Sequence, residues 1–485
     1  MDRPAPPAAD RPGTPPAGGR RAGAGDPPDP ARATLRPAHA PWLPEAVAPE
    51  RGLPRFFRTR RRIRRAIWLV PVGWLAIGYA LAVALPDLDR TNRAQIDLAL
   101  VNVSADSARA TLSSIATGMI TFTGVVFSIL LLVIQFGNTA FSPRYVQWVR
   151  GDRVTLHALG VFMATAIYAL AAINEIGSTT VEGGKEFVPE FTLAFGFVLT
   201  LASFGMFVWM TTRTIRNFQV SSAVRLVGER GAVAISELYP ARVEAEDGVD
   251  DGPEIPIADA DPVILRQRQH PGFIVAVDGR RLVAIGRRAD AIVELAAPVG
   301  AHVASGAPLV RIHGSSRRPN ERWLRTAIVI GRERTIEQDP AFAFRILVDV
   351  AIKALSPAVN DPTTAVQALN SLEDLLRRVA WRRLEVGQLR DKDGQVRVLL
   401  PTPGWDDYID LALTEIREYG ERSAQVMRRM RALLEDLKDG VPASRLPAIQ
   451  RHLMLLGESV QDGFRSPADR AFALGRDPMG IGGET

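Results

Sequence analysis

The chain of 485 residues has no cysteine and very little lysine. The absence of cysteine excludes disulfides, thiolate metal sites and cysteine nucleophiles. Lysine occurs at four positions, so 55 of the 59 basic residues are arginine (59 − 4 = 55). P-loops, HExxH zinc sites and GxSxG nucleophile elbows are also missing. We therefore expect no enzyme activity and no cofactor. We also expect no metal site, because the histidines form no ligand-like pair on one helix; they are His39, His157, His270, His302, His313 and His452.

Charge is missing from the centres of four long apolar segments. The segments span residues 66–85, 112–136, 156–173 and 191–212. Each holds roughly 18–25 residues, enough for a helix to cross the hydrocarbon core of a bilayer. We predict an α-helical membrane protein whose four transmembrane helices form a domain over residues 53–216. Charges at mid-membrane usually mark pumps and ion-coupled carriers, so their absence argues against these classes and leaves a passive or mechanically gated pore open.

The distribution of arginine predicts how the chain sits in the membrane. Residues 1–65 carry 14 Arg against 6 Asp and Glu, and basic and acidic flanks then alternate along the four segments. Because basic flanks stay on the cytoplasmic side, we expect a multi-pass protein of the bacterial inner (plasma) membrane with both termini in the cytoplasm. Residues 1–52, rich in Pro, Ala and Gly, have the composition of a disordered tail.

The excess positive charge lies in this tail and beside the first apolar segment, not on a folded surface. Such a position favours anionic lipid head groups over nucleic acid as the partner. The same charge is also sufficient to set the topology without any lipid contact. The residues that would make the contact are Arg58, Arg60, Arg61, Arg62, Arg64 and Arg65.

The second apolar segment keeps one small, polar edge, with residues recurring at steps of 3 and 4. Small residues let helices approach closely, and buried hydroxyls bond across helices. The same edge could instead line a water path in an oligomeric pore. Both interpretations, helix packing and pore lining, stay open. Helices with such edges pack against copies of themselves or against one another, and we therefore expect a homo-oligomer. The edge consists of Ser114, Thr117, Thr121, Gly124, Ser128 and Gln135.

Residues 217–335 alternate apolar side chains between Gly and Pro turns, which predicts a β-rich cytoplasmic module. The stretch "PVGAHVASGAPLVRI" resembles a half-motif of the barrel-sandwich hybrid folds, in which glycines allow tight turns. The carriers of that group need a modified lysine. No lysine lies between Lys185 and Lys353, so the carrier role is excluded and a compact β module remains.

Residues 336–462 have helical patterns, followed by an expected loose tail over 463–485. Two of the helices begin with Asp-Pro, at Asp339 and Asp361, where Asp can cap the first turn and Pro is favoured just inside it. The loop between these helices could hold an anion on the free amides of the second helix, or it could be a plain capped turn. The residues of this candidate functional loop are Ser356, Pro357, Asn360, Asp361 and Pro362.

Three stretches together resemble a known family. They are "ATLSSIATGMITFTGVVFSILLLVIQFGNTAFSPRYVQ", the segment beginning "PGFIVAVD", and "VIGRERTIEQDPAFAFRILVDVAIKALSPAVNDPTTAVQALNSL". In this order they are similar to the bacterial predicted-membrane-protein family called domain of unknown function 2254. The likeness covers about residues 55–460, and "RERT…QDPAF…ALSPAVNDPTTA" is its most specific part. It implies an inner-membrane protein with a cytoplasmic C-terminal half, and no known reaction or cofactor.

Two functions fit this layout. The first is a passive or gated channel, in which the second apolar segments surround the path. The alternative is a membrane-anchored sensor or scaffold, whose cytoplasmic half binds a ligand or partner. The predicted fold class for both is four transmembrane helices followed by an α+β region, β-rich first and helical after.

Overall fold

The computed structural model describes residues 69–91, 104–140, 153–176, 188–217, 219–241, 243, 261–268, 270–314, 319–384 and 387–481. The predicted tail over residues 1–52 and the arginines from Arg58 to Arg65 lie outside the described residues. So do most of the loops whose charges predict the orientation in the membrane.

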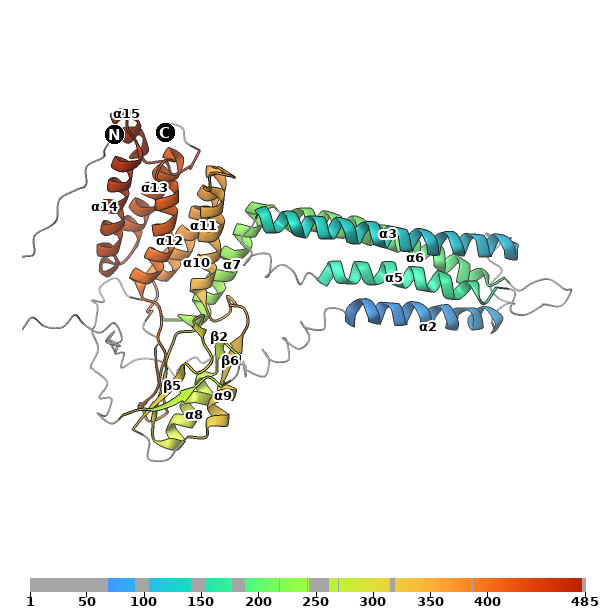
Figure 1. Ribbon diagram of the computed structural model, residues 1–485, viewed down its shortest axis with the longest axis horizontal. Coiled ribbons are helices and arrows are strands. Elements are labelled where there is room, and N and C mark those ends of the chain that lie inside the picture. The colour runs from blue at the N-terminus through green and yellow to red at the C-terminus, as the bar shows by residue number, and fades with distance from the viewer. Residues whose placement is uncertain are drawn as a thin grey trace, which may run out of the picture. The chain divides into compact units, whose positions relative to one another are not determined.

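Within the described residues, four helices are long and apolar enough to cross a membrane (Figure 1). They are α2 (Leu69–Thr91), α3 (Ala105–Ala140), α5 (Arg153–Ile173) and α6 (Glu190–Asn217). Their apolar windows run over Leu69–Leu88, Ala105–Val133, Val154–Ile173 and Glu190–Arg216. The four apolar segments of the sequence therefore all fold as helices, because unbroken apolar runs of this length satisfy their backbone groups internally only in that form.

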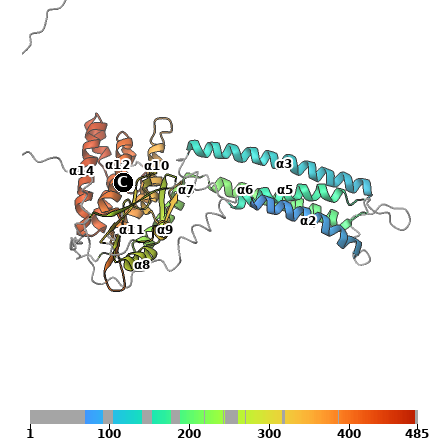
Figure 2. The ribbon, with the colours of Figure 1, turned by 60° about the horizontal axis from the view of Figure 1, so that its bottom comes forward.

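Helix α5 is the centre of this bundle. It packs against α2, α3 and α6 and lies between α2 and α3 in both views (Figure 1, Figure 2). Polar groups bond across the contacts: Thr165 and Ser203 share a buried hydroxyl pair at 2.9 Å, and the Tyr168 hydroxyl donates to the Thr192 carbonyl at 2.7 Å. Buried hydroxyls paired in this way give the bundle specific helix–helix contacts.

A second helical group shares one large apolar core. Its main members are α7 (Val220–Leu238), α10 (Pro340–Ala354), α11 (Pro362–Ala380), α12 (Trp405–Gly420), α13 (Ala424–Gly440) and α14 (Leu446–Gly463). The turn η1 (Ala443–Arg445) leads into α14, and α15 (Pro467–Ala473) closes the group. The Asp-Pro starts behave as expected: Asp339 and Asp361 accept hydrogen bonds from Phe342 N and Thr364 N at 3.2 and 3.1 Å.

The strands of the described part of the chain form two small sheets. The five-stranded sheet has the order β1 (Val263–Arg266), β5 (Pro308–His313), β3 (Ile292–Leu295), β8 (Val396–Leu399) and β7 (Gln388–Arg390). The three-stranded sheet has the order β4 (His302–Val303), β2 (Gly272–Val277) and β6 (Ile328–Gly331). Helices α8 (Gly279–Ala289) and α9 (Glu321–Ala327) lie between strands of the chain and pack on one another.

The predicted order, β-rich first and helical after, is not supported. Helix α7 precedes β1, the first strand among the described residues, and buries Val224, Val227 and Ile235 in the helical core. Strands β7 and β8 follow α11, and β8 pairs in parallel with β3 at the centre of the larger sheet. The later elements thus form two layers, the strand region and the helical core. Each element belongs to the layer that covers its apolar face, whatever its place along the chain.

The end of the chain also differs from the loose tail that we expected. Residues 464–481 contain α15, with Ala473 and Asp477 fully buried. The Gln425 side chain donates to the Gly480 carbonyl at 2.6 Å, and the Arg428 guanidinium lies 4.3 Å from the centre of the Phe472 ring. These contacts hold the segment on α13. Their partners are distant in sequence, so local composition did not reveal them.

Candidate functional site: the outward face of α3

The small, polar edge of the second apolar segment lies on the side of α3 that faces away from the bundle. The packed side of α3 carries Leu112, Ala116, Met119 and Val126, all buried. Residue 121 lies two positions after Met119, which turns it by about 200° around the helix axis. All six predicted edge residues are exposed: Ser114, Thr117, Thr121, Gly124, Ser128 and Gln135. We call this edge the outward face of α3.

Three hydroxyls on the outward face bond to their own helix. Ser114 donates to the Ala110 carbonyl at 2.8 Å, Thr121 to the Thr117 carbonyl at 3.0 Å, and Ser128 to the Gly124 carbonyl at 3.0 Å. A hydroxyl that donates once still has lone pairs that can accept a bond. The face therefore offers neutral acceptors, at regular intervals, to whatever lies beside it.

The glycines show that no described part of the chain packs closely on this edge. A Cβ added at Gly78 of α2 would lie 2.5 Å from the Ala164 oxygen of α5, and one at Gly160 would lie 2.5 Å from Trp74 Cδ1. Those glycines permit the close approach of α2 and α5. A Cβ added at Gly118 or Gly124 would meet nothing within 4 Å. Packing between the described helices of one chain thus does not explain the outward face.

The candidate loop between α10 and α11 is a rigid capped turn. The Asp361 carboxylate accepts from Thr364 N and, at 2.6 Å, from Thr364 Oγ1. Asp361 N donates to the Ala354 carbonyl at 2.8 Å, and Ser356 Oγ to the Lys353 carbonyl at 2.7 Å. Asn360 has φ 47°, a left-handed conformation that suits asparagine. The carboxylate thus occupies the helix start where an anion would otherwise bind.

Residues 334–339 form a junction that we did not single out as a site from the sequence. Arg334 holds the buried Asp339 through Nε and Nη2 at 2.8 and 2.7 Å, while Asp339 caps α10. Burial raises the pKa of the Asp339 carboxyl, and the Arg334 charge opposes this shift. The turn at Gly300 lies against both side chains, and Gln338 accepts from Val277 N of β2 at 2.8 Å.

The junction therefore ties the strand region to the helical core. Its only sequence signal was the Asp-Pro start of α10, because the partners Gly300 and Val277 are far away in the chain. Nothing in the local pattern indicates that a turn of one layer will meet a helix cap of the other.

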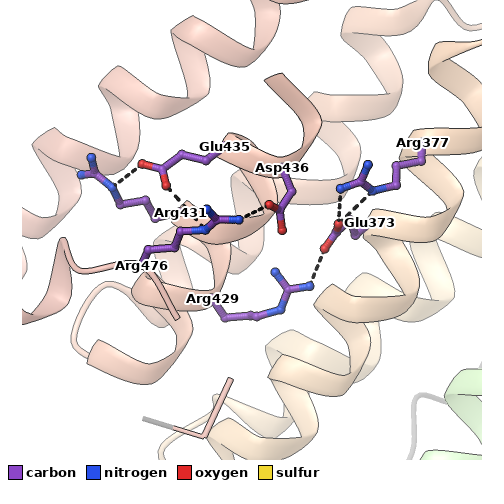
Figure 3. A network of polar contacts seen from close by, with 7 residues as sticks. All are labelled: Glu373, Arg377, Arg429, Arg431, Glu435, Asp436 and Arg476. Carbon is purple, nitrogen blue, oxygen red and sulfur yellow. Dashed lines mark hydrogen bonds and ion pairs between the residues drawn. The ribbon is translucent and has the colours of Figure 1, made fainter. Parts of the chain in front are cut away.

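A network of charged side chains joins α11, α13 and the C-terminal segment (Figure 3). Glu373 of α11 bonds Arg377 at 2.9 Å and also bonds Arg429 of α13. Arg476 bonds Asp436, and Arg431 bonds Glu435 at 2.9 Å. The side chains of Arg429 and Glu373 are 6% and 12% exposed, so this ion pair between α11 and α13 is shielded from water.

A buried histidine lies in the larger sheet. His313 Nε2 lies 2.7 Å from Glu294 Oε2, and Arg311 bonds the other oxygen of Glu294 at 2.8 Å. His302, in β4 of the smaller sheet, instead packs edge-on against Phe273. Within the described residues no group of three or more His, Asp and Glu side chains has the geometry of a metal site.

Residues 64–436 match the family described as predicted membrane protein DUF2254. The chain belongs to this family. An uncharacterized protein of Mycobacterium tuberculosis is 28% identical over 421 residues, covering 85% of this chain and 80% of the relative. An uncharacterized protein of Mycobacterium bovis matches with the same identity and coverage. No solved structure matches the chain.

The part that matches DUF2254 contains the outward face of α3, the capped turn and the junction at residues 334–339. It ends inside α13, so α14, α15 and Arg476 lie beyond it. Membership confirms the resemblance and a membrane location. It carries no reaction and no site residues with it.

Proposed function

We propose that this DUF2254 protein assembles with copies of itself in the membrane, and that the outward faces of α3 surround a passive passage. The observation that carries the proposal is the open edge of hydroxyls and glycines on α3. An edge that no other described helix of the chain covers is available to water or to another copy. When several α3 helices form a ring, the outward face of each helix contacts both the water inside the ring and the neighbouring copy.

The chemistry of the edge favours passive conduction. Ser114, Thr121 and Ser128 are neutral and keep acceptor lone pairs, so they can replace part of the hydration of a permeating solute. The large side chains beside the edge, such as Ile120 and Phe127, are also exposed. In a ring they would contact the next copy, because apolar side chains of this size are favourable against either lipid or protein.

The proposal includes a topology. The chain would lie in the inner membrane as a multi-pass protein with both termini in the cytoplasm, as the arginine-rich flanks favour. The region from α7 onward would then form a cytoplasmic vestibule. Reporter fusions after residues 103, 145, 182 and 216 test this arrangement; a periplasmic signal after residue 216 would overturn it.

A pair of threonines separates pore lining from helix integrity. Thr121 lies on the outward face, whereas Thr123 is half-buried and makes the same kind of bond, at 2.6 Å to the Met119 carbonyl. In planar bilayers, Thr121→Val should change the conductance of the purified protein and Thr123→Val should not. Wild-type protein that never conducts under voltage or tension would dismiss the passage and favour the sensor or scaffold.

Assembly is tested separately, because the chain has no cysteine of its own. With a single cysteine at Thr121→Cys or Ser128→Cys, oxidation in membranes should give covalent dimers. Thr123→Cys, on the side turned toward the bundle, should stay monomeric. Equal cross-linking at positions 121 and 123 would contradict assembly through the outward face.

A further inference from the structure

The capped turn between α10 and α11 exposes an apolar tip. Pro357, Ala358 and Val359 are all exposed, Val359 by 51% of its surface. The turn is not loose: Val359 N and Asn360 N both donate to the Ser356 carbonyl, at 3.0 and 2.9 Å. The tip is therefore held outward by a fixed backbone whose donors are largely satisfied.

The register of α7 against α11 places this tip along the chain's path from the membrane. A Cβ at Gly228 would lie 3.6 Å from Ser371, and one at Gly231 would lie 3.1 Å from Leu375. The two helices thus run parallel, with contacts advancing together. Counting back eight residues from each member of the first pair brings Val220, where α7 begins, level with Thr363, at the start of α11.

The start of α7 is tied to the end of α6. Helix α6 ends at Asn217 and α7 begins at Val220. Three residue steps span at most roughly 10 Å. The apolar window of α6 extends to Arg216, so a chain that leaves the bilayer with α6 enters α7 at once. The start of α11, and the turn before it, are then close to the lipid surface.

We propose that the tip Pro357–Ala358–Val359 docks into the head-group boundary of the bilayer. Its chemistry suits that place. Proline has no N–H, and the N–H groups of Val359, Asn360 and Asp361 are already bonded within the turn. Because these donors are satisfied within the turn, the apolar side chains can enter the boundary with fewer backbone groups that need water. Arg213 and Arg216, in the last residues of α6, place positive charge where the chain leaves the bilayer, the depth at which anionic head groups lie.

The inference requires α6 to cross the membrane, but it does not depend on assembly through α3 or on conduction. The experiment uses the full chain. Because the natural sequence has no cysteine, each introduced cysteine is the single site for labelling. The Val359→Cys variant is labelled with an environment-sensitive fluorophore and placed in vesicles of phosphatidylethanolamine and phosphatidylglycerol. The vesicles also contain lipids spin-labelled near the head group, which quench a fluorophore at that depth. The matched control is Arg378→Cys, on an exposed position of the same helix pair and about 25 Å farther along α11.

The fluorophore at position 359 should be quenched several-fold more than the one at position 378, with a blue-shifted emission. Ala358→Cys should behave like Val359→Cys, and it serves as the test if the first variant does not fold. Equal quenching at positions 358, 359 and 378 would overturn the proposal. Because quenching lipids occupy both leaflets, the result does not depend on the orientation of the protein in the vesicle.

Discussion

The junction at Gly300 depends on individual atoms. Gly300 has φ 91°, and Gly306, six residues later, has φ 82°. Both turns require a backbone conformation that costs other residues about 1–2 kcal/mol. They differ in their surroundings: a Cβ at Gly300 would lie 2.2 Å from Asp339 Oδ2, whereas a Cβ at Gly306 would meet nothing within 4 Å.

This pair yields a prediction with its own control. Gly306→Ala should lower the free energy of unfolding by about 1–2 kcal/mol, the conformational term alone. Gly300→Ala should cost more, because it also displaces the Asp339 carboxylate from Arg334 and from the cap of α10. Thermal unfolding of the purified chain in detergent compares the two variants. Equal losses would show that the contact with Asp339 contributes nothing.

Two tyrosines make the helical core sensitive to alkaline pH. The hydroxyls of Tyr239 and Tyr408 lie 3.1 Å apart, and both side chains are buried. Burial raises the pKa of Tyr239 to about 12, and it also raises the pKa of Tyr408. In the unfolded chain a tyrosine titrates near pH 10. Below that pH both states are protonated and the tyrosines contribute their full stability.

As the pH rises from 10 to 12, only the unfolded state loses protons, so the folded state loses stability. The expected slope is about 1.4 kcal/mol per pH unit for each buried tyrosine. Only four lysines and six tyrosines are present, which leaves few other groups titrating in this window. Tyr239→Phe should reduce the slope of stability against pH, measured by denaturation at several pH values. Tyr419→Phe, at an exposed position, should leave the slope unchanged.

Among the elements, the contact between α11 and α13 depends on a buried ion pair. Arg429 of α13 bonds Glu373 and, at 2.7 Å, Asn370 of α11. Asp374, the residue after Glu373 on α11, bonds Arg378 on the surface. The side chains of Asp374 and Arg378 are 56% and 49% exposed. Two adjacent carboxylates on α11 thus form one buried and one exposed ion pair. Figure 3 shows the buried pair, Glu373 with Arg429.

Glu373→Gln should destabilise the protein by about 3–5 kcal/mol, because it leaves the buried Arg429 charge without a carboxylate. Asp374→Asn should cost less than about 1 kcal/mol, as exposed pairs usually do. Chemical denaturation of both variants measures the difference. Losses of similar size would mean that the network at Arg429 is not shielded as the geometry indicates.

At the scale of the whole molecule, the strand region and the helical core are interleaved along the chain. Helix α7 belongs to the helical core although it precedes the first described strand in the chain, and β8 belongs to the larger sheet although it follows α11. Neither layer is therefore a continuous stretch of sequence. A fragment cut between them leaves apolar faces uncovered in both.

This arrangement predicts which fragments fold. Residues 219–481, which contain both layers, should give a soluble protein with one cooperative thermal transition by circular dichroism. Residues 217–335, the module suggested by the sequence pattern, lack β7, β8 and the helices that cover α7. They should be unfolded or aggregate. A cooperative transition in the shorter fragment would show that the strand region is independent after all.

Composition and periodicity alone determined the four apolar helices and the membrane location, because the length and apolarity of a span are local properties. The caps at Asp339 and Asp361 were predictable for the same reason, since a cap involves residues three positions apart. The small edge of α3 could also be found from its steps of 3 and 4.

The tertiary structure decided which way that edge faces and which layer each later element joins. Thr121 and Thr123 are the same residue type on the same helix, and only the packing of α3 against its neighbours in the bundle makes one of them outward and the other half-buried. Likewise, only contacts across more than a hundred residues bring β8 beside β3 and α7 against α11. Such contacts depend on which apolar faces can cover one another in three dimensions, and no local pattern of residues records that choice.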